Sequence, residues 1–424
     1  MLQPVVWCLC VIVAAMAWAS PAWGAPPDGY AMADSTGGPA AASSATSRHV
    51  QSRAGPRAGP RLLASQSPFA RGWNRQFFIG PSVLAGERSA LAGEQRFRLP
   101  GDFESHEAIV VVADGLARDF PEILTAIVAG SKGSQSVIAL VSSPLHRAYV
   151  ARVLAKGRLS PDSVRFVLAP TNTIWMRDFG PLFVCRSDGA RCAVDPGYGK
   201  PSRAADDAVP AAVARQFHAS LSTTVLTWHG GNLLSNGRGL LLTTIQAVNA
   251  NIEAGHDTRT IKRFLGGQLG AAQIVALEPL RGERTAHVDM FACFTSADTV
   301  VVGDYSRSVD RVNAAVLDRN AARLAEIRVE GKKLNVIRVP MPSNRDGVWR
   351  TYTNVIFAGG TLLVPGYPRV SMASQRRAMA VYERCLPGWQ VVSVDLRALI
   401  RHEGGLRCIS TYVPLRRKGP GPES

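Results

Sequence analysis

The chain has 424 residues, 46% of them hydrophobic, which is long enough for one large domain or two smaller ones with a sizeable core. Its formal net charge of +16 raises the question of nucleic-acid or anionic-membrane binding. Part of this charge lies near the two ends, in six arginines between residues 48 and 75 and in the run Arg416, Arg417 and Lys418. No RNP, zinc-finger or helix-turn-helix pattern accompanies these residues, so the sequence argues against specific nucleic-acid recognition.

The first residues have the pattern of an export signal. The apolar run VVWCLCVIVAAMAWA precedes SPAWGAPP, where Ala22 and Gly24 fit the small-residue positions of a cleavage site. No Lys or Arg precedes the run, which departs from the usual signal, and the run is short for a membrane span. We therefore predict a signal peptide over residues 1–24 and a secreted or periplasmic protein without a stable membrane span after cleavage.

Composition divides the rest of the chain into three parts. Residues 25–77 are rich in Ala, Ser, Pro, Gly and Arg and have no sustained period, which predicts a disordered linker. Residues 78–414 have the pattern of a folded domain, and residues 415–424 form a basic tail. The domain is expected to contain strands at 106–114, 136–143, 163–170, 334–339 and 389–396, and helices beginning near 121 and covering about 144–157, 207–220, 257–268, 309–329 and 373–385. Such alternation over more than 300 residues predicts an α/β fold.

Three hairpin turns are also predicted, at Asp188-Gly189, Asn236-Gly237 and Gly359-Gly360. Cysteines flank the first of them. Cys185 and Cys192 could close a disulfide in an oxidising compartment, but two unpaired strand cysteines fit the pattern equally well. Export would leave five cysteines in the mature chain, an odd number, so at least one would stay free unless chains cross-link.

The stretch TNTIWMRDFGP places a wide aromatic ring, an arginine and a carboxylate before a break at Gly180-Pro181. Trp175 and Asp178 could frame a flat cation, which needs a face to lie on and a charge to hold it. An ordinary strand-end turn with a surface ion pair is the other interpretation.

Two later stretches also contain residue types that catalyse reactions. If TAHVDMFACF is a strand, His287 and Asp289 project from the same face, where a base and a carboxylate can bind a cation or move protons. In HEGGLRCISTYVP, Cys408 is either an ordinary buried cysteine or a functional thiol. A functional thiol needs an electropositive neighbour, and a cationic substrate held by the two acids would supply one. Gly230-Gly231 and Gly404-Gly405 predict places where the backbone approaches another group closely.

In chain order, WMRDFGP, GGN, HVDMF, YTN and GGLRCIS resemble the motifs of guanidino-group-modifying enzymes. They are most similar to those of the agmatine deiminases and the Porphyromonas-type peptidylarginine deiminases. The resemblance runs from about residue 97 to 414. It implies the pentein fold, a five-fold pseudosymmetric α/β propeller of ββαβ-like units around a central substrate channel. It also implies a hydrolase that acts on the carbon–nitrogen bonds of linear amidines with no metal and no organic cofactor.

The resemblance assigns roles to matching positions. The implied catalytic set comprises two guanidinium-binding carboxylates, a general acid and base, and a nucleophile: Asp178 and Asp289, His287, and Cys408. Trp175 and Asn354 match positions that line the substrate site. Thiolate attack would form a covalent thiouronium and release ammonia, and water would then release a ureido product.

Departures from the agmatine deiminase pattern bear on the substrate. His229 stands before the glycines, where agmatine deiminases have Glu, and Ile245 follows Thr-Thr where they have another Glu. A histidine at the first position is more like the peptidylarginine deiminases. The stretch GYGKPSRAADDAVP resembles the segment that carries their carboxylate-binding arginines, with a spacing that differs by one. Lys200 or Arg203 could therefore bind a substrate carboxylate, unless both are solvated loop charges.

We therefore expect conversion of peptidyl-arginine to peptidyl-citrulline and ammonia. One alternative is an agmatine deiminase that yields N-carbamoylputrescine for putrescine biosynthesis. Another is a non-catalytic secreted binding protein of the same fold. The implied partner in every case is a guanidino compound, an arginine peptide or agmatine.

Overall fold

The structure, a computed structural model, describes residues 97–370 and 372–416. The predicted signal peptide, the linker, the first residues of the predicted domain and most of the basic tail lie outside these residues. Within them, the strands form five sheets of three or four strands and one two-stranded ribbon. No helix among the described residues combines the length and the apolar character that crossing a membrane requires.

One three-strand arrangement recurs in all five larger sheets. Two antiparallel strands come first, and a helical connection then leads to a third strand that runs parallel to the second. The unit after the first motif shows this order: β5 (Leu182–Arg186), β6 (Arg191–Gly197), α7 (Ala204–Asp207), α8 (Val209–Gln216) and β7 (Ser220–Thr227). The short strand β1 (Phe97–Arg98) extends its sheet beyond β5. Helical crossovers are what parallel neighbours require.

The next three units repeat this order along the chain. They are β8 (Leu234–Ser235), β9 (Leu240–Thr244), α9 (Ile245–Glu253), α10 (Thr258–Lys262) and β10 (Gln273–Leu277); β11 (Ala292–Phe294), β12 (Thr299–Asp304), α11 (Arg311–Ala325) and β15 (Asn335–Pro340); and β16 (Ile356–Ala358), β17 (Thr361–Gly366), α12 (Met372–Cys385) and β18 (Gln390–Asp395). A π-helical turn, Arg263–Gln268, continues α10. The two-stranded ribbon is β13 (Arg328–Val329) with β14 (Lys332–Lys333).

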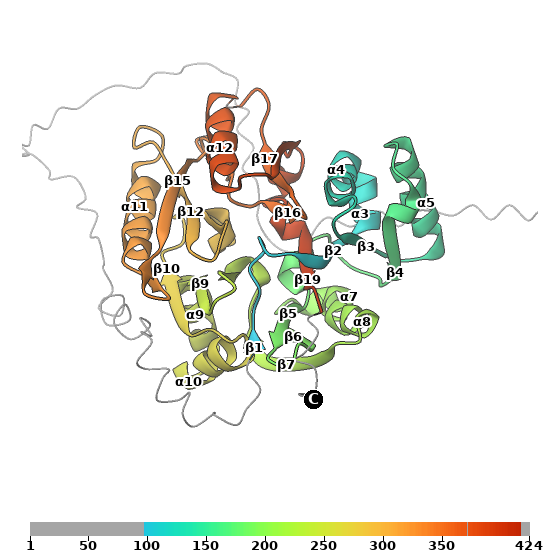
Figure 1. The fold of residues 1–424 in the computed structure, drawn as a ribbon, viewed down its shortest axis with the longest axis horizontal. Coiled ribbons are helices and arrows are strands. Elements are labelled where there is room, and N and C mark those ends of the chain that lie inside the picture. Colours follow the sequence, from blue (N-terminus) through green and yellow to red (C-terminus); the bar gives the residue numbers. More distant parts are fainter. Residues whose placement is uncertain (1–96, 371, 417–424) are drawn as a thin grey trace, which may run out of the picture. The chain divides into compact units, whose positions relative to one another are not determined.

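The fifth unit joins the two ends of the described chain. The last strand, β19 (Ser410–Pro414), pairs antiparallel with β2 (His106–Val112), and β2 pairs parallel with β3 (Ser136–Val141). The elements that complete this unit are α3 (Ala113–Asp119), α4 (Pro121–Ser131), α5 (Pro144–Lys156) and β4 (Val164–Leu168). Pairing of β19, at the end of the described chain, with β2, near its start, closes the series, so the five sheets surround a common centre (Figure 1).

The sequence of β2, HEAIVVV, is almost continuously apolar because both faces of its sheet are covered. Ile109 and Val111 belong to one buried cluster with residues of α4 and β17. Ala108 and Val110 point the other way, into a cluster that includes Phe183 of β5. A strand buried on both faces cannot show the alternation of a half-exposed one.

The hairpin at Asp188-Gly189 forms as predicted, but the candidate disulfide within it is wrong. The register of β5 and β6 pairs Cys185 with Arg191 and Val184 with Cys192. Because directly opposed residues share a face and successive residues alternate, the two sulfur atoms lie on opposite faces of the hairpin. Cys192 is free, and the hydroxyl of Ser220 donates to its Sγ at 3.0 Å.

Candidate active site

The five sequence motifs occupy equivalent places in the five units. Each lies immediately before the first strand of its unit: α6 (Met176–Phe179) before β5, η3 (Gly230–Asn232) before β8, η5 (Val288–Met290) before β11, residues 352–354 before β16, and η7 (Arg407–Ile409) before β19. Since the units surround a common centre, equivalent positions meet there (Figure 1). The repeat of the fold therefore brings together motifs that are far apart in sequence.

Hydrogen bonds fix neighbouring motifs to one another. The backbone N–H of Val288 donates to Asn232 Oδ1 at 3.1 Å, which connects η5 to η3. The hydroxyl of Thr353 donates to the carbonyl of Asp289 at 3.0 Å, which connects η5 to the segment before β16. All four residues are buried, so these contacts hold the motifs in a fixed arrangement.

Glycines permit the close approach that the sequence predicted. A Cβ atom on Gly404 would lie 2.1 Å from the ring of Trp175, and one on Gly231 would lie 2.4 Å from His287 Nδ1. Real Cβ atoms do not come this close to other heavy atoms. The two glycines therefore let the first and last motifs, and the second and third, pack directly together.

Cys408 lies in η7 and is buried. The side-chain amide of Asn354 donates to its Sγ at 3.3 Å, and Asn354 Oδ1 accepts the N–H of Arg407 at 2.7 Å. Burial raises the pKa of the Cys408 thiol well above its ordinary value, and the nearby carboxylates of Asp289 and Asp178 raise it further. The sulfur is therefore protonated while no cation occupies the site.

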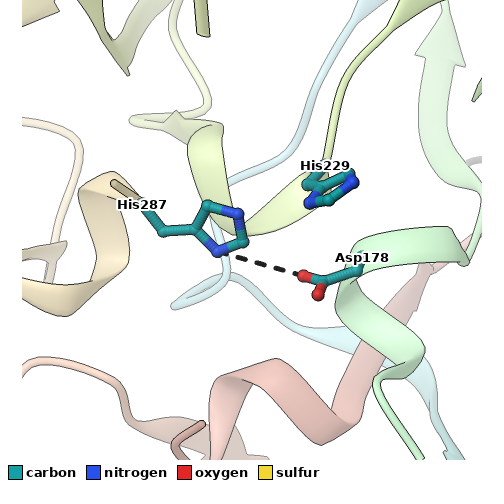
Figure 2. A group of neighbouring side chains, drawn as sticks. All are labelled: Asp178, His229 and His287. Atoms are coloured by element: carbon teal, nitrogen blue, oxygen red, sulfur yellow. Dashed lines mark ion pairs between the residues drawn. The ribbon is translucent and has the colours of Figure 1, made fainter. Parts of the chain in front are cut away.

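His287 and Asp289 are not on a strand, and the predicted strand through TAHVDMFACF is wrong in this part. Residues 288–290 form a 3₁₀ turn, and β11 begins only at Ala292. His287 Nδ1 lies 3.9 Å from Asp178 Oδ1 (Figure 2). Burial lowers the pKa of His287 to about 4, so the imidazole is neutral near pH 7. Burial also raises the pKa of Asp178 to about 6.

Asp289 binds an arginine of the protein itself. Arg407 Nη1 donates to Asp289 Oδ2 at 2.9 Å, and Arg407 Nε donates to Asp102 Oδ2 at 2.6 Å. The same guanidinium donates to the carbonyls of Gly230 and Leu233, at 3.2 and 2.9 Å. Burial raises the pKa of the Asp289 carboxyl, and the charge of Arg407 opposes that shift.

Neither Arg407 nor Asp102 was assigned a role from the sequence motifs. Arg407 stands beside Cys408 in the quoted motif, and a charged residue in the otherwise apolar stretch GGLRCIS is a signal that could have identified it. Asp102 lies 305 positions before its partner and carries no comparable signal.

Two carboxylate oxygens at this centre have no hydrogen-bond donor among the described residues. They are Oδ1 of Asp178 and Oδ1 of Asp289, and both atoms are buried. Buried polar atoms are almost always hydrogen-bonded, and an ionised one without a partner is costly. The arrangement therefore suits a ligand that brings both positive charge and N–H donors.

The remaining predicted residues lie on one side of this centre. His229 precedes η3, and its ring meets that of His287 edge-on, with centroids 5.5 Å apart (Figure 2). Its Nε2 lies 3.2 Å from the carbonyl of Tyr198, whose hydroxyl accepts a hydrogen bond from Arg203 Nη1 at 2.8 Å. Burial lowers the pKa of His229, and the charges of Lys200 and Arg203 add to this shift. Arg203 is partly buried, whereas Lys200 is exposed.

Solved structures identify the fold. An agmatine deiminase of Enterococcus faecalis superposes with a TM-score of 0.66 at 20% identity, covering 76% of this chain and 96% of that one. The agmatine deiminase of C. jejuni superposes with a TM-score of 0.64 at 19% identity, covering 76% and 97%. The predicted pentein fold is confirmed.

The chain belongs to the Porphyromonas-type peptidyl-arginine deiminase family, whose profile it matches over residues 99–414. The agmatine deiminase of Pseudomonas aeruginosa strain LESB58 is 25% identical over 366 residues, which cover 76% of this chain and 96% of that protein. Membership of this family makes the chain a hydrolase that acts on guanidino carbon–nitrogen bonds.

Replacing Arg407 tests its structural role. Arg407→Gln should lower the free energy of unfolding by about 3–5 kcal/mol, because Asp102 and Asp289 would lose their countercharge. Denaturant unfolding measures the loss. The double variant Arg407→Gln, Asp102→Asn should lose less stability than the sum of the losses in the two single variants, since the two residues interact directly. Arg319→Gln, which breaks an exposed pair with Glu278, is the control and should change stability little. Equal losses in Arg407→Gln and the control would contradict the role.

Proposed function

We propose that the chain hydrolyses the guanidinium of peptide-bound arginine to give peptidyl-citrulline and ammonia through a thiouronium on Cys408. The observation that carries this proposal is the pair of buried, donor-free oxygens on Asp178 and Asp289, close to a thiol and an imidazole. A guanidinium is planar, carries five N–H donors and one positive charge, and so can satisfy both acids at once.

Substrate binding activates the nucleophile in this mechanism. The carboxylates that raise the pKa of Cys408 are the ones that the guanidinium neutralises. Its arrival therefore lowers the cost of forming a thiolate, and the neutral imidazole of His287 accepts the proton. The sulfur then bonds to the guanidinium carbon. Addition of the thiolate anion to the guanidinium cation gives a neutral tetrahedral adduct, and Asp178 and Asp289 hold the positive charge that the adduct gains when His287 returns the proton.

The leaving group departs with the proton that His287 has taken. The imidazolium donates it to one nitrogen, the carbon–nitrogen bond breaks, and ammonia leaves a thiouronium on Cys408. His287, neutral again, removes a proton from water, whose oxygen attacks the same carbon. As the carbon–sulfur bond breaks, the imidazolium of His287 protonates the sulfur and returns the thiol, and the ureido product leaves after its hydroxyl proton passes to solvent. Asn354 keeps the sulfur in place through the contact of 3.3 Å.

Charges at one side of the site favour a substrate that ends in a carboxylate. Arg203 forms no ion pair with an acid among the described residues, yet its charge acts on Asp178. Agmatine carries an amine instead, which needs an acid, and this chain has His229 and Ile245 at the two positions described above. A peptide with a C-terminal arginine therefore fits these charges better.

Agmatine deimination to N-carbamoylputrescine is the second candidate, and the names of the relatives favour it. A third, a binding protein without catalysis, would leave the proximity of thiol, imidazole and carboxylates unexplained. We also propose that the protein is exported, because residues 1–24 have the pattern of a signal peptide. N-terminal sequencing of the mature protein tests cleavage.

Replacing the nucleophile tests the mechanism. Cys408→Ser should lower turnover by at least about a thousandfold, because a neutral hydroxyl is a much weaker nucleophile than a thiolate. A colour assay for ureido products on arginine peptides, free arginine and agmatine measures the change. Cys192→Ser makes the same substitution at a buried cysteine on β6 and should keep activity. Substantial turnover by Cys408→Ser would rule out the thiouronium.

The pH dependence of kcat/KM should show an acid limb near pH 6. The raised pKa of Asp178, about 6, means that this carboxylate is charged only above that pH, so the guanidinium loses one of its two acids below it. Bound guanidinium lowers this pKa, so the limb of kcat should lie at lower pH than that of kcat/KM. His287, with a pKa of about 4, stays neutral across this limb. Identical limbs for both parameters would contradict the assignment to Asp178.

Substrate preference tests whether Arg203 or Lys200 binds the carboxylate of a C-terminal arginine. Peptides with a C-terminal arginine should be deiminated faster than agmatine, and Arg203→Ala should remove that preference by raising KM for the peptides. Lys200→Ala tests the other candidate cation in the same way. If agmatine is preferred and neither variant alters the ratio, the protein is an agmatine deiminase despite His229 and Ile245.

A further inference from the structure

The reaction proposed above gives no chemical step to His229, although its ring lies at the catalytic centre. Its Nε2 faces the backbone carbonyl of Tyr198 at 3.2 Å. A carbonyl oxygen can only accept, so Nε2 carries the proton and Nδ1 carries the lone pair. Figure 2 shows the ring with a nitrogen turned toward His287 and Asp178. His229 therefore presents a neutral nitrogen ligand to the same space as the two catalytic side chains.

The three side chains are close enough to share one ion. Each offers one ligand atom, and these atoms all lie within 4.8 Å of one another. Bonds of 2.0–2.1 Å to tetrahedral Zn²⁺ place two ligand atoms about 3.4 Å apart. The pair His287 Nδ1 and Asp178 Oδ1, at 3.9 Å, would need to approach by about 0.5 Å. The other pairs lie within 4.8 Å of one another, so none would need to approach by more than about 1.4 Å.

Two further features are typical of metal ligands. A histidine that binds a metal usually donates its other N–H to a carbonyl or carboxylate, which fixes the tautomer, and His229 does so to Tyr198. Asp178 Oδ1 has no hydrogen-bond donor among the described residues, so its lone pairs are available. The three ligands come from the motifs before β5, β8 and β11, and the hydrogen bond from Val288 to Asn232 joins the last two of these motifs.

We propose that Asp178, His229 and His287 bind one Zn²⁺ ion, which competes reversibly with the guanidinium substrate. Two imidazoles and one carboxylate are a ligand set that zinc accepts, with a fourth position left for water. The ion coordinates the nitrogen lone pair of His287, the proposed base, and the carboxylate of Asp178, which would otherwise bind the guanidinium. It therefore inhibits the enzyme. This inhibition rests on the proposed function, whereas the binding of zinc does not.

Zinc binding to the full chain is measured first, in the Cys408→Ser background so that no thiolate takes part. Titration calorimetry should show a site that Asp178→Asn, His229→Gln and His287→Gln each weaken by at least about 100-fold, because even outer-shell losses cost 10–100-fold. Circular dichroism verifies that each variant is folded. His146→Gln is the matched control, since His146 is an exposed histidine with its Nδ1 3.8 Å from Asp114 Oδ2, and it should leave the affinity unchanged. Equal affinity in all variants would overturn the proposal.

Cobalt supplies a readout that does not depend on activity. Co²⁺ added to the protein with Cys408 intact should give a visible spectrum without a thiolate charge-transfer band, and Cys408→Ser should give the same spectrum. A band that disappears in Cys408→Ser would place the ion on the thiol and overturn the site.

Whichever of a C-terminal arginine peptide and agmatine the wild-type enzyme deiminates faster, added to the Co²⁺ form of Cys408→Ser, should displace the ion and remove its spectrum. A spectrum unchanged by a saturating concentration of that compound would overturn the competition. If zinc binds through the three residues but the protein deiminates no guanidino compound, the proposed function fails while the zinc site stands.

Discussion

The centre of this protein depends on one buried guanidinium of its own. Arg407 binds Asp102, Asp289 and two backbone carbonyls, so it connects the segment before β2, the third motif and the second motif to the one that carries Cys408. Such a group is costly to bury and is stable only because every partner is in place. Arg407 also gives the two carboxylate oxygens of Asp289 different roles. Oδ2 is held by the protein, which leaves Oδ1 for a ligand.

The charges of this centre explain why a monovalent cation suits it. Three carboxylates, Asp102, Asp178 and Asp289, face two arginines, Arg177 and Arg407, so three negative charges minus two positive ones leave one negative charge. The imidazole and the thiol are neutral near pH 7 because burial disfavours their charged forms. A single guanidinium neutralises the excess. The charge balance thus favours a cationic ligand before any contact with the tail of a substrate.

The residues that the sequence motifs single out lie together because the motifs occupy one repeated place in the fold. Sequence reasoning failed where the answer depended on local geometry. The 3₁₀ turn at Val288–Met290 lies in a stretch whose apolar residues are typical of a strand. The strand register that separates Cys185 from Cys192 depends on the length of the hairpin turn, which the residue types do not determine. Asp102 was missed because its partner is 305 positions away. Helix α9 was also missed, since its stretch IQAVNANIE buries little more than Val248 and Asn251.

His229 shows how one departure from a family pattern can change two properties of a site. A carboxylate at this position would add negative charge beside the guanidinium and could hold a second cation, such as an amine. A neutral imidazole, fixed by the carbonyl of Tyr198, adds no charge and leaves the excess at one. Outside the centre, the charge of Arg203 also acts on Asp178 and lowers the pKa of its carboxyl. The same neutral nitrogen is a ligand that transition metals prefer and guanidinium groups do not need.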